Sequence, residues 1–149
     1  MTLRMDPETA RAVHAIAEAA YPAEGAGLLL GRLHDDGVRR VTAILPLENR
    51  WEAGEQTRRY RLDPIDLLEA EDEAERSGLT ILGVFHSHPD HPARPSAFDL
   101  DRALPFYSYL ITSVESGVAR ESRSWRLRDD RGAFIEETVL AESGPKENA

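Results

Sequence analysis

The sequence predicts a single α/β domain in which a mixed, curved β-sheet is flanked by helices. Two observations support this prediction: segments with helical spacing of apolar residues alternate with short aliphatic runs typical of strands, and the helical segments have clear start signals. The 149 residues fit one domain that is large enough to bury a core. We place this domain at residues 1–140 and a disordered polar tail at residues 141–149.

The first expected elements are a helix and a hairpin. Asp6 is a suitable N-cap and Pro7 a suitable first helical residue, so a helix is expected to continue to about Ala20. Aliphatic runs at residues 28–33 and 38–47 flank the sequence HDDG, in which Asp-Gly is a strong turn signal. These two runs are therefore expected to pair as an antiparallel hairpin.

A short strand with the sequence RRYRL and a second helix come next. The helix starts with Asp63 as N-cap and Pro64 at the first helical position, and Gly78 ends it. The helix is expected to pack through its apolar positions Ile65, Leu68 and Ala74. Its acidic run at residues 69–75 then points outward, so we interpret that run as a solvated face and not as a metal site.

The remaining apolar runs are expected to be strands. The run LTILGVF, at residues 79–85, is rich in aliphatic residues and follows a Ser-Gly break. It is therefore expected to be a buried strand that ends where the next histidines begin. Three further strands are expected after Pro105, with the sequences YSYLITSV, SRSWRL and AFIEETV.

The segment HSHPDHPARPSAFD, at residues 86–99, is the most informative part of the chain. If the strand geometry continues through His86 and His88, their side chains at i and i+2 leave the same face of the sheet. Two imidazoles can then converge on one metal ion, although a chain with five histidines can also give such a pair by chance. An open, catalytic zinc site needs a third protein ligand.

Asp99 is the best candidate for that third ligand. Three prolines deny the segment after the second histidine regular hydrogen bonding, so the chain has to loop out before it becomes helical again. Ser96 is an acceptable N-cap, which puts Asp99 at the third helical position. There its carboxylate faces the loop at the favourable end of the helix dipole.

A hydrolytic metal site also needs a group that takes a proton from water, and a glutamate serves this purpose. Spacing alone does not choose among the many acidic residues of this chain. Glu24 stands out because it follows the first helix and a Tyr-Pro pair, and it opens the apolar run GAGLLLG. A lone glutamate in such a place is also an ordinary strand-edge residue.

The stretches PAEGAGLLLGR and HSHPDHPARPSAFD together resemble the signature of the JAMM, or MPN-plus, metalloprotease family. The resemblance covers nearly the whole chain and implies an MPN-like fold with a cytidine-deaminase-like arrangement. It also implies that His86, His88 and Asp99 bind zinc. Glu24 would be the general base and proton shuttle, and the Ser96 hydroxyl would help to stabilise the tetrahedral oxyanion.

Two positions qualify this resemblance. Many relatives have a cysteine where this chain has Ala26, a departure that touches packing and not the chemistry. For Ser96 the ordinary alternative is a plain helix cap, which contributes about 1 kcal/mol, and the cap and oxyanion roles are compatible.

The resemblance further implies a substrate class. Small bacterial members without insertions resemble peptidases that cut after the C-terminal Gly-Gly of ubiquitin-like proteins, including sulfur-carrier proteins. The substrate tail is expected to add along a sheet edge near the metal. The alternatives are a deubiquitinase-like isopeptidase that acts on protein conjugates and a noncatalytic MPN scaffold or binding module. Because scaffold members typically lose ligands, the complete residue set favours the enzyme.

Composition excludes several other functions. The absence of cysteine excludes disulfides, thiolate zinc ligands and a cysteine-protease mechanism, and it fits a reducing compartment. A net charge of −9 argues against a nucleic-acid partner. The N-terminus has no apolar signal region, and no run approaches the length of a membrane helix, so a cytoplasmic protein without membrane contact is expected.

Three other histidines and one polar segment remain to be interpreted. His91 lies inside the proline-rich loop, where it is expected to be solvated, with substrate contact or metal binding as alternatives. His14 and His34 are expected to be structural or surface residues. Residues 49–60 form either a substrate-binding flap or an ordinary connection.

Overall fold

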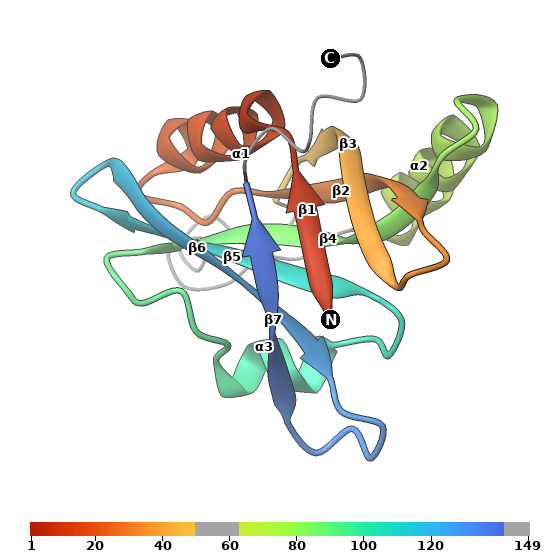
Figure 1. Ribbon diagram of the computed structural model, residues 1–149. Coiled ribbons are helices and arrows are strands. Elements are labelled where there is room, and N and C mark those ends of the chain that lie inside the picture. The colour runs from red at the N-terminus through yellow and green to blue at the C-terminus, as the bar shows by residue number, and fades with distance from the viewer. Residues whose placement is uncertain (50–62, 142–149) are drawn as a thin grey trace, which may run out of the picture.

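The computed structural model describes residues 1–49 and 63–141, and within them a seven-stranded sheet closes into a barrel (Figure 1). The strands are β1 (Thr2–Met5), β2 (Ala26–Leu33), β3 (Val38–Leu47), β4 (Thr80–Pro89), β5 (Ser108–Glu115), β6 (Val118–Leu127) and β7 (Phe134–Leu140). The helices are α1 (Pro7–Ala20), α2 (Pro64–Arg76) and α3 (Ala97–Arg102). The strand RRYRL and nearly all of the proposed tail lie outside the described residues, as does the 49–60 segment except for Asn49.

The sheet is mixed and curved, as predicted. Its strand order is β1-β3-β2-β4-β5-β6-β7, and β1 also pairs with β7 to close the barrel. The β4–β5 pair and both pairs of β1 are parallel, whereas the other neighbours are antiparallel. The predicted hairpin is confirmed, because β2 and β3 pair antiparallel around a turn in which Gly37 adopts a φ of 85°. That left-handed conformation favours glycine.

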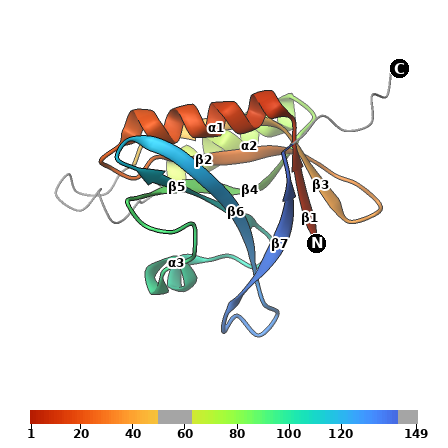
Figure 2. The same ribbon diagram turned by 60° about the vertical axis from the view of Figure 1, so that its left-hand side comes forward.

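The two longer helices pack on opposite faces of the sheet. Leu29 of β2 belongs to the apolar cluster that contains Val13 of α1, whereas Leu28 belongs to the cluster that contains Ala70 of α2. Successive strand residues point to opposite faces, so the sheet lies between α1 and α2. Figure 2 shows α1 lying along one side of the sheet, with α3 on its own near the far end of the molecule. No helix in the described ranges is long and apolar enough to cross a membrane.

The predicted packing face of α2 is correct at Ala74 and wrong at Ile65 and Leu68. Ile65 and Leu68 have exposed fractions of 63% and 62%, whereas Ala70 and Ala74 are buried against the sheet. Small alanine side chains let the helix approach the sheet closely, whereas Ile65 and Leu68 face solvent. The acidic run at residues 69–75 is exposed around Ala70 and Ala74, as expected.

Two strand predictions also need correction. The strand β1 was not predicted, although Leu3 and Met5 alternate with polar residues and are buried in the barrel. The strand β4 does not end at the histidines but continues through both of them to Pro89. This extension determines the geometry of the site.

Candidate metal centre

The end of β4 brings two imidazoles together. Because the strand continues through His86 and His88, both side chains leave the same face, as the sequence predicted. Both residues are buried, and their Nε2 atoms lie 3.2 Å apart. Two ring nitrogens therefore point at one position.

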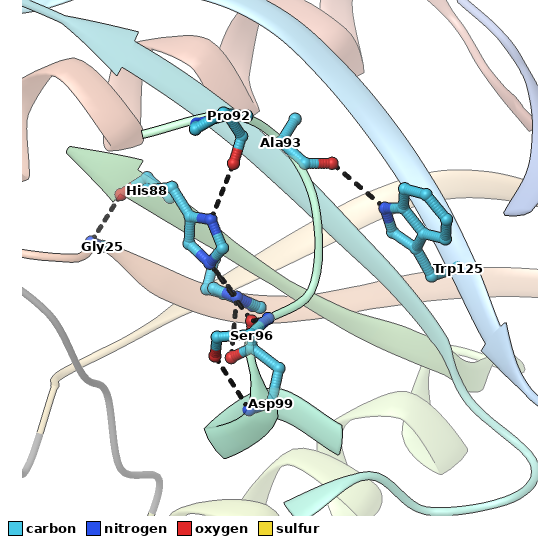
Figure 3. A network of polar contacts seen from close by, with 9 residues as sticks. Gly25, His88, Pro92, Ala93, Ser96, Asp99 and Trp125 are labelled. Carbon is cyan, nitrogen blue, oxygen red and sulfur yellow. Dashed lines mark hydrogen bonds and ion pairs between the residues drawn. The ribbon is translucent and has the colours of Figure 1, made fainter. Parts of the chain in front are cut away.

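The short helix α3 adds a carboxylate to the same position. Ser96 caps the helix: its Oγ accepts a hydrogen bond of 3.0 Å from the Asp99 backbone N–H, and its own N–H donates to Asp99 Oδ2 at 2.8 Å. This capping box aims the Asp99 side chain back along the loop (Figure 3). Asp99 Oδ1 lies 3.3 Å from His86 Nε2, and Oδ2 lies 3.2 Å from His88 Nε2. The structure thus brings together all three sequence-predicted ligands.

The loop between β4 and α3 fixes the orientation of His88. Its Nδ1 lies 2.9 Å from the Pro92 carbonyl oxygen, which only accepts hydrogen bonds, so Nδ1 carries the proton and donates it. Its Nε2 then faces Asp99 and His86. A backbone carbonyl behind a histidine is a common device for orienting a metal ligand.

Trp125 of β6 holds the same loop from the other side. Its Nε1–H donates to the carbonyl oxygen of Ala93 at 3.1 Å, next to the carbonyl that contacts His88 (Figure 3). Sequence reasoning missed this residue, because nothing in the run SRSWRL shows which backbone atom the indole meets. The one available signal was the indole N–H itself, which needs a partner when partly buried.

Ser87 lies between the two histidines and faces the opposite way. Its Oγ accepts a hydrogen bond of 2.8 Å from the Gly25 backbone N–H, and its own backbone N–H donates to the Gly25 carbonyl at 3.0 Å. The β2–β4 register pairs Ala26 with His86, and continuing it by two residues places Glu24 opposite His88. Ser87 therefore fixes the segment that carries the glutamate, a role the sequence did not reveal.

Glu24 is buried beside the histidines, with an exposed fraction of 4%. One ligand atom from each of Glu24, His86 and His88 forms a group in which all atoms lie within 4.8 Å of one another. The Oε1 atom of Glu24 has no hydrogen-bond partner among the described residues. The pKa of this carboxyl is raised to about 8, mainly by burial; His88 opposes the shift and Asp99 adds to it. The carboxyl is therefore poised to hold a proton at neutral pH.

Charge favours an ionised Asp99. Burial alone would raise the pKa of its carboxyl, but the two histidines and the Ser96 backbone N–H lower it well below its usual range. Burial lowers the pKa of the His86 imidazole, against the opposing effect of Asp99. Burial also acts to lower the pKa of His88, but the hydrogen bond and the charge of Asp99 outweigh it and raise that pKa. Metal ions bind carboxylates and neutral imidazoles, so metal binding here would release the proton that Asp99 favours on His88.

The spacing of these atoms fits a tetrahedral metal site. Donors about 2.0–2.1 Å from a zinc ion at tetrahedral angles lie roughly 3.3 Å from one another. The separations among His86, His88 and Asp99 are 3.2–3.3 Å. Glu24 also offers an atom within 4.8 Å of an atom of each histidine. Both carboxylates therefore lie within reach of an ion bound by the two imidazoles.

A cavity of about 300 Å³ opens beside this cluster. It is lined by Glu24, His88, His91, Pro92, Arg94 and Ser96. His91 is exposed in the cavity wall and does not belong to the group of converging donors. Of the two alternatives to a solvated side chain, contact with substrate fits this position better than metal binding. His14 lies on α1 with its Nε2 3.2 Å from Ser122 Oγ, and His34 is exposed in the β2–β3 turn.

JAB/MPN domain proteins share this fold, a mixed sheet that closes into a barrel and carries helices on both faces. A JAB1/MPN domain protein from Archaeoglobus fulgidus aligns over 92% of this chain and 98% of its own, with a TM-score of 0.56 and 21% identity. The chain belongs to the family of prokaryotic homologs of the JAB domain, whose family model matches residues 6–128. The predicted resemblance to the JAMM family is thereby confirmed.

Similar proteins include two named proteases. A probable TtuB-protein conjugate cleaving protease from Thermus thermophilus is 39% identical over 102 residues, which cover 68% of this chain and 62% of that protein. A desampylase from Haloferax volcanii is 40% identical over 95 residues, or 63% of this chain and 65% of that protein. The chain thus spans less than two thirds of the length of these two relatives.

Two solved structures match almost the whole chain. A protein from Desulfitobacterium hafniense has a TM-score of 0.83 and 31% identity, with 98% of this chain and 97% of that chain covered. A protein from Salinibacter ruber has a TM-score of 0.75 and 39% identity, with 98% and 94% covered. Both support the fold seen in the described residues.

Proposed function

We propose that this protein is a zinc-dependent peptidase or isopeptidase that hydrolyses the bond after the C-terminal Gly-Gly of a ubiquitin-like or sulfur-carrier protein. One observation carries the proposal: two buried imidazoles and one carboxylate converge at ligand spacing while a second carboxylate stands beside them. The names of the Thermus and Haloferax relatives, which describe cleavage of TtuB conjugates and desampylation, support a protein conjugate as substrate.

Within this proposal His86, His88 and Asp99 hold the zinc ion. When bound, zinc would lower the pKa of a coordinated water toward about 7 and polarise the scissile carbonyl. The capping box of α3 and the Pro92 carbonyl hold two of these ligands in place before any metal arrives. Such preorganisation reduces the ordering that metal binding would otherwise require.

Glu24 and Ser96 supply the remaining chemistry. Glu24 accepts a proton from the attacking water and passes it to the leaving amine, and its raised pKa of about 8 suits a group that both takes and gives protons near neutral pH. Ser96 Oγ accepts its capping hydrogen bond from the Asp99 N–H, so its own hydroxyl proton remains available for the oxyanion. Its cap and oxyanion roles are compatible in this geometry.

The substrate tail reaches the site through the cavity. An extended tail that adds along a sheet edge stays a prediction; β4 itself has no free edge, because it is paired with β2 on one side and β5 on the other. Glycine residues near the scissile bond suit a chain that must pass close to buried ligands, since they lack a Cβ. The complete residue set favours an enzyme over a noncatalytic MPN scaffold. The lack of cysteine supports activity in a reducing cytoplasm.

The test is to incubate the zinc-loaded protein with a ubiquitin-like carrier whose C-terminal Gly-Gly is joined to a lysine, and to follow masses over time. Cleavage after the second glycine is expected, and a Gly→Val change at either position should slow it sharply. Glu24→Gln is the matched inactive control, because it removes the base and no ligand. A zinc-loaded protein that cleaves no Gly-Gly carrier, or a Glu24→Gln variant with wild-type turnover, would contradict the proposal.

A further inference from the structure

Tyr21 joins the segment that carries Glu24 to the end of β4. It is the C-cap residue of α1, and its hydroxyl donates a hydrogen bond of 2.6 Å to Asp90 Oδ2. Asp90 directly follows the last residue of β4 and lies two positions after His88. The hydrogen bond therefore connects the two parts of the chain that meet at the metal centre, although neither residue lines the cavity beside Glu24.

Asp90 is itself held in place by its neighbours. Its Oδ1 accepts a hydrogen bond of 2.8 Å from the Ser116 N–H, and its own N–H donates to the Val114 carbonyl at 2.6 Å. Its backbone has a φ of 57°, in the left-handed region that aspartate tolerates better than most residues. The end of β5 and the turn after it thus fix a carboxylate that is a strong acceptor for the Tyr21 hydroxyl.

The segment from Tyr21 to Gly25 is attached at both of its ends. Gly25 is bound to Ser87 by two hydrogen bonds, and Tyr21 is bound to Asp90. Ser87 and Asp90 lie on either side of one imidazole of the metal centre. Because both attachments end on the stretch of chain that carries this imidazole, they determine where Glu24 lies relative to it.

The position of the Glu24 carboxylate depends on these attachments. Its Oε1 has no hydrogen-bond partner among residues 1–49 and 63–141, so the backbone that carries the side chain has to place it. The Glu24 carbonyl accepts a further hydrogen bond of 3.0 Å from Asn49 Nδ2. A base has to lie within hydrogen-bond reach of the proton that it takes, and a misplacement of 1 Å can lower the rate by about 100-fold.

We propose that Tyr21 is a positioning residue: through its hydrogen bond to Asp90, it holds the Glu24 carboxylate at the correct distance from the two imidazoles. This inference rests on the proposed peptidase function, in which Glu24 is the base. Since Tyr21 lies outside the cavity lining, its loss should slow the chemical step and leave the binding of substrate and metal unchanged. In kinetic terms, kcat falls while KM and the zinc affinity stay the same.

The first measurement is the kinetics of Tyr21→Phe, which keeps the ring and removes only the hydroxyl. The substrate is a ubiquitin-like carrier whose C-terminal Gly-Gly is joined to a lysine, and the enzyme is the zinc-loaded full chain. We expect kcat to fall by about 10-fold, which corresponds to one hydrogen bond to a charged group, with KM and zinc affinity unchanged. Asp90→Gly keeps the left-handed backbone and removes the acceptor, so it should lower kcat at least as much. The double variant should be no slower than Asp90→Gly, because both substitutions remove the same contact.

The second measurement needs no catalysis. The Gly25 N–H donates to Ser87 Oγ at 2.8 Å, so its hydrogen exchange reports how firmly the segment is held. In the metal-free protein, NMR should show this amide exchanging about 3- to 10-fold faster in Tyr21→Phe than in the wild type. Tyr107→Phe is the matched control, because it removes the hydroxyl of a half-buried tyrosine whose ring packs against the cluster that contains Ala70. It should keep the wild-type kcat and the wild-type exchange rate.

The outcomes separate this inference from the peptidase proposal. If the wild type cleaves the carrier and Tyr21→Phe has the same kcat, the positioning role is overturned and the peptidase stays intact. The role is also overturned if kcat falls only together with the zinc content, or if the Gly25 amide exchanges equally fast in both proteins. Failure of the zinc-loaded wild type to cleave the carrier overturns the peptidase function and, with it, this inference.

Discussion

Buried polar side chains gather at both ends of β4, and the two clusters differ in how their charge is balanced. At the carboxyl end, Glu24 and Asp99 lie beside two histidines. Near the amino end, the buried Arg39 guanidinium donates to the Leu82 carbonyl at 2.9 Å and to Ser108 Oγ at 3.3 Å. It also stacks over the Phe106 ring, 4.6 Å from its centroid.

The Arg39 cluster contains its own cation. The buried Glu137 carboxylate accepts a hydrogen bond of 2.6 Å from Ser124 Oγ, and it opposes the lowering of the Arg39 pKa that burial causes. At the other end of β4 the carboxylates of Glu24 and Asp99 act against each other. Burial is common to both clusters and does not separate function from structure. The kind of cation does: among the described residues no arginine or lysine forms an ion pair with Glu24 or Asp99, so an added metal ion would be stabilising at that end.

The largest effect is expected from removing a metal ligand. His88→Ala should lose stoichiometric zinc and with it all measurable hydrolysis, because two donors cannot hold the ion as three do. Metal analysis of the purified variant and of the wild type after zinc addition measures this directly. A His88→Ala protein with full zinc content would show that the ligands have been assigned wrongly.

At the other cluster the expected loss is in stability. Arg39→Met removes the hydrogen bonds to Leu82 and Ser108 and the positive charge that acts on the buried Glu137 carboxylate, so it should lower the free energy of unfolding by about 3–5 kcal/mol. Adding Glu137→Gln in the same chain should recover part of that loss. Urea unfolding measures both values, and the zinc content of the folded variants should stay that of the wild type. If Arg39→Met lost zinc while remaining folded, the two clusters would not be independent.

Local signals predicted much of this fold and site correctly. Pro7 and Asp63 mark helix starts that the structure confirms, and Ser96 caps α3 with Asp99 at the third helical position. Each of these signals acts over a few residues, because a cap or a turn satisfies neighbouring backbone groups. The convergence of His86 and His88 was predictable for the same reason, since strand geometry alone puts them on one face.

Features that depend on distant pairing were not predictable. Strand β1 has four residues and exists because β3 and β7 pair with it from far along the chain. Whether α2 packs through the face that contains Leu68 or the face that contains Ala70 depends on how closely the sheet approaches the helix. The spacing of apolar residues in the helix does not give that distance. The contact of Trp125 with the loop likewise joins residues 32 positions apart.

The metal-free protein should show a pH dependence that belongs to Glu24. Burial raises its folded-state pKa to about 8, whereas an unfolded glutamate has a pKa of about 4.3. Between these values the folded chain binds more protons than the unfolded chain, so its free energy of unfolding falls as pH rises. Glu24→Gln removes this loss and should be more stable than the wild type by a few kcal/mol at about pH 8.5, with a smaller difference at about pH 5.5.

Urea unfolding in the presence of a chelator measures this difference. The matched control is Glu121→Gln, at an exposed carboxyl on β6, which should unfold like the wild type at both pH values. A stability gain in Glu24→Gln that did not change with pH would mean that the substitution acts through packing and not through the proton.

The smallest expected effect concerns the loop that supports His88. Trp125→Phe keeps an aromatic ring and removes the hydrogen bond to Ala93, so the loop holds the Pro92 carbonyl less firmly behind the imidazole. Zinc affinity in a chelator competition should fall by about 3- to 10-fold, which corresponds to roughly 1 kcal/mol for one lost hydrogen bond. Tyr109→Phe, which removes a hydrogen bond of 2.6 Å to the Leu104 N–H, is the control and should keep wild-type affinity. A changed absorption spectrum of the cobalt-substituted Trp125→Phe protein would show that the ligand geometry is altered. Equal zinc affinities in the wild type and both variants would contradict the prediction and show that the indole contributes only to packing.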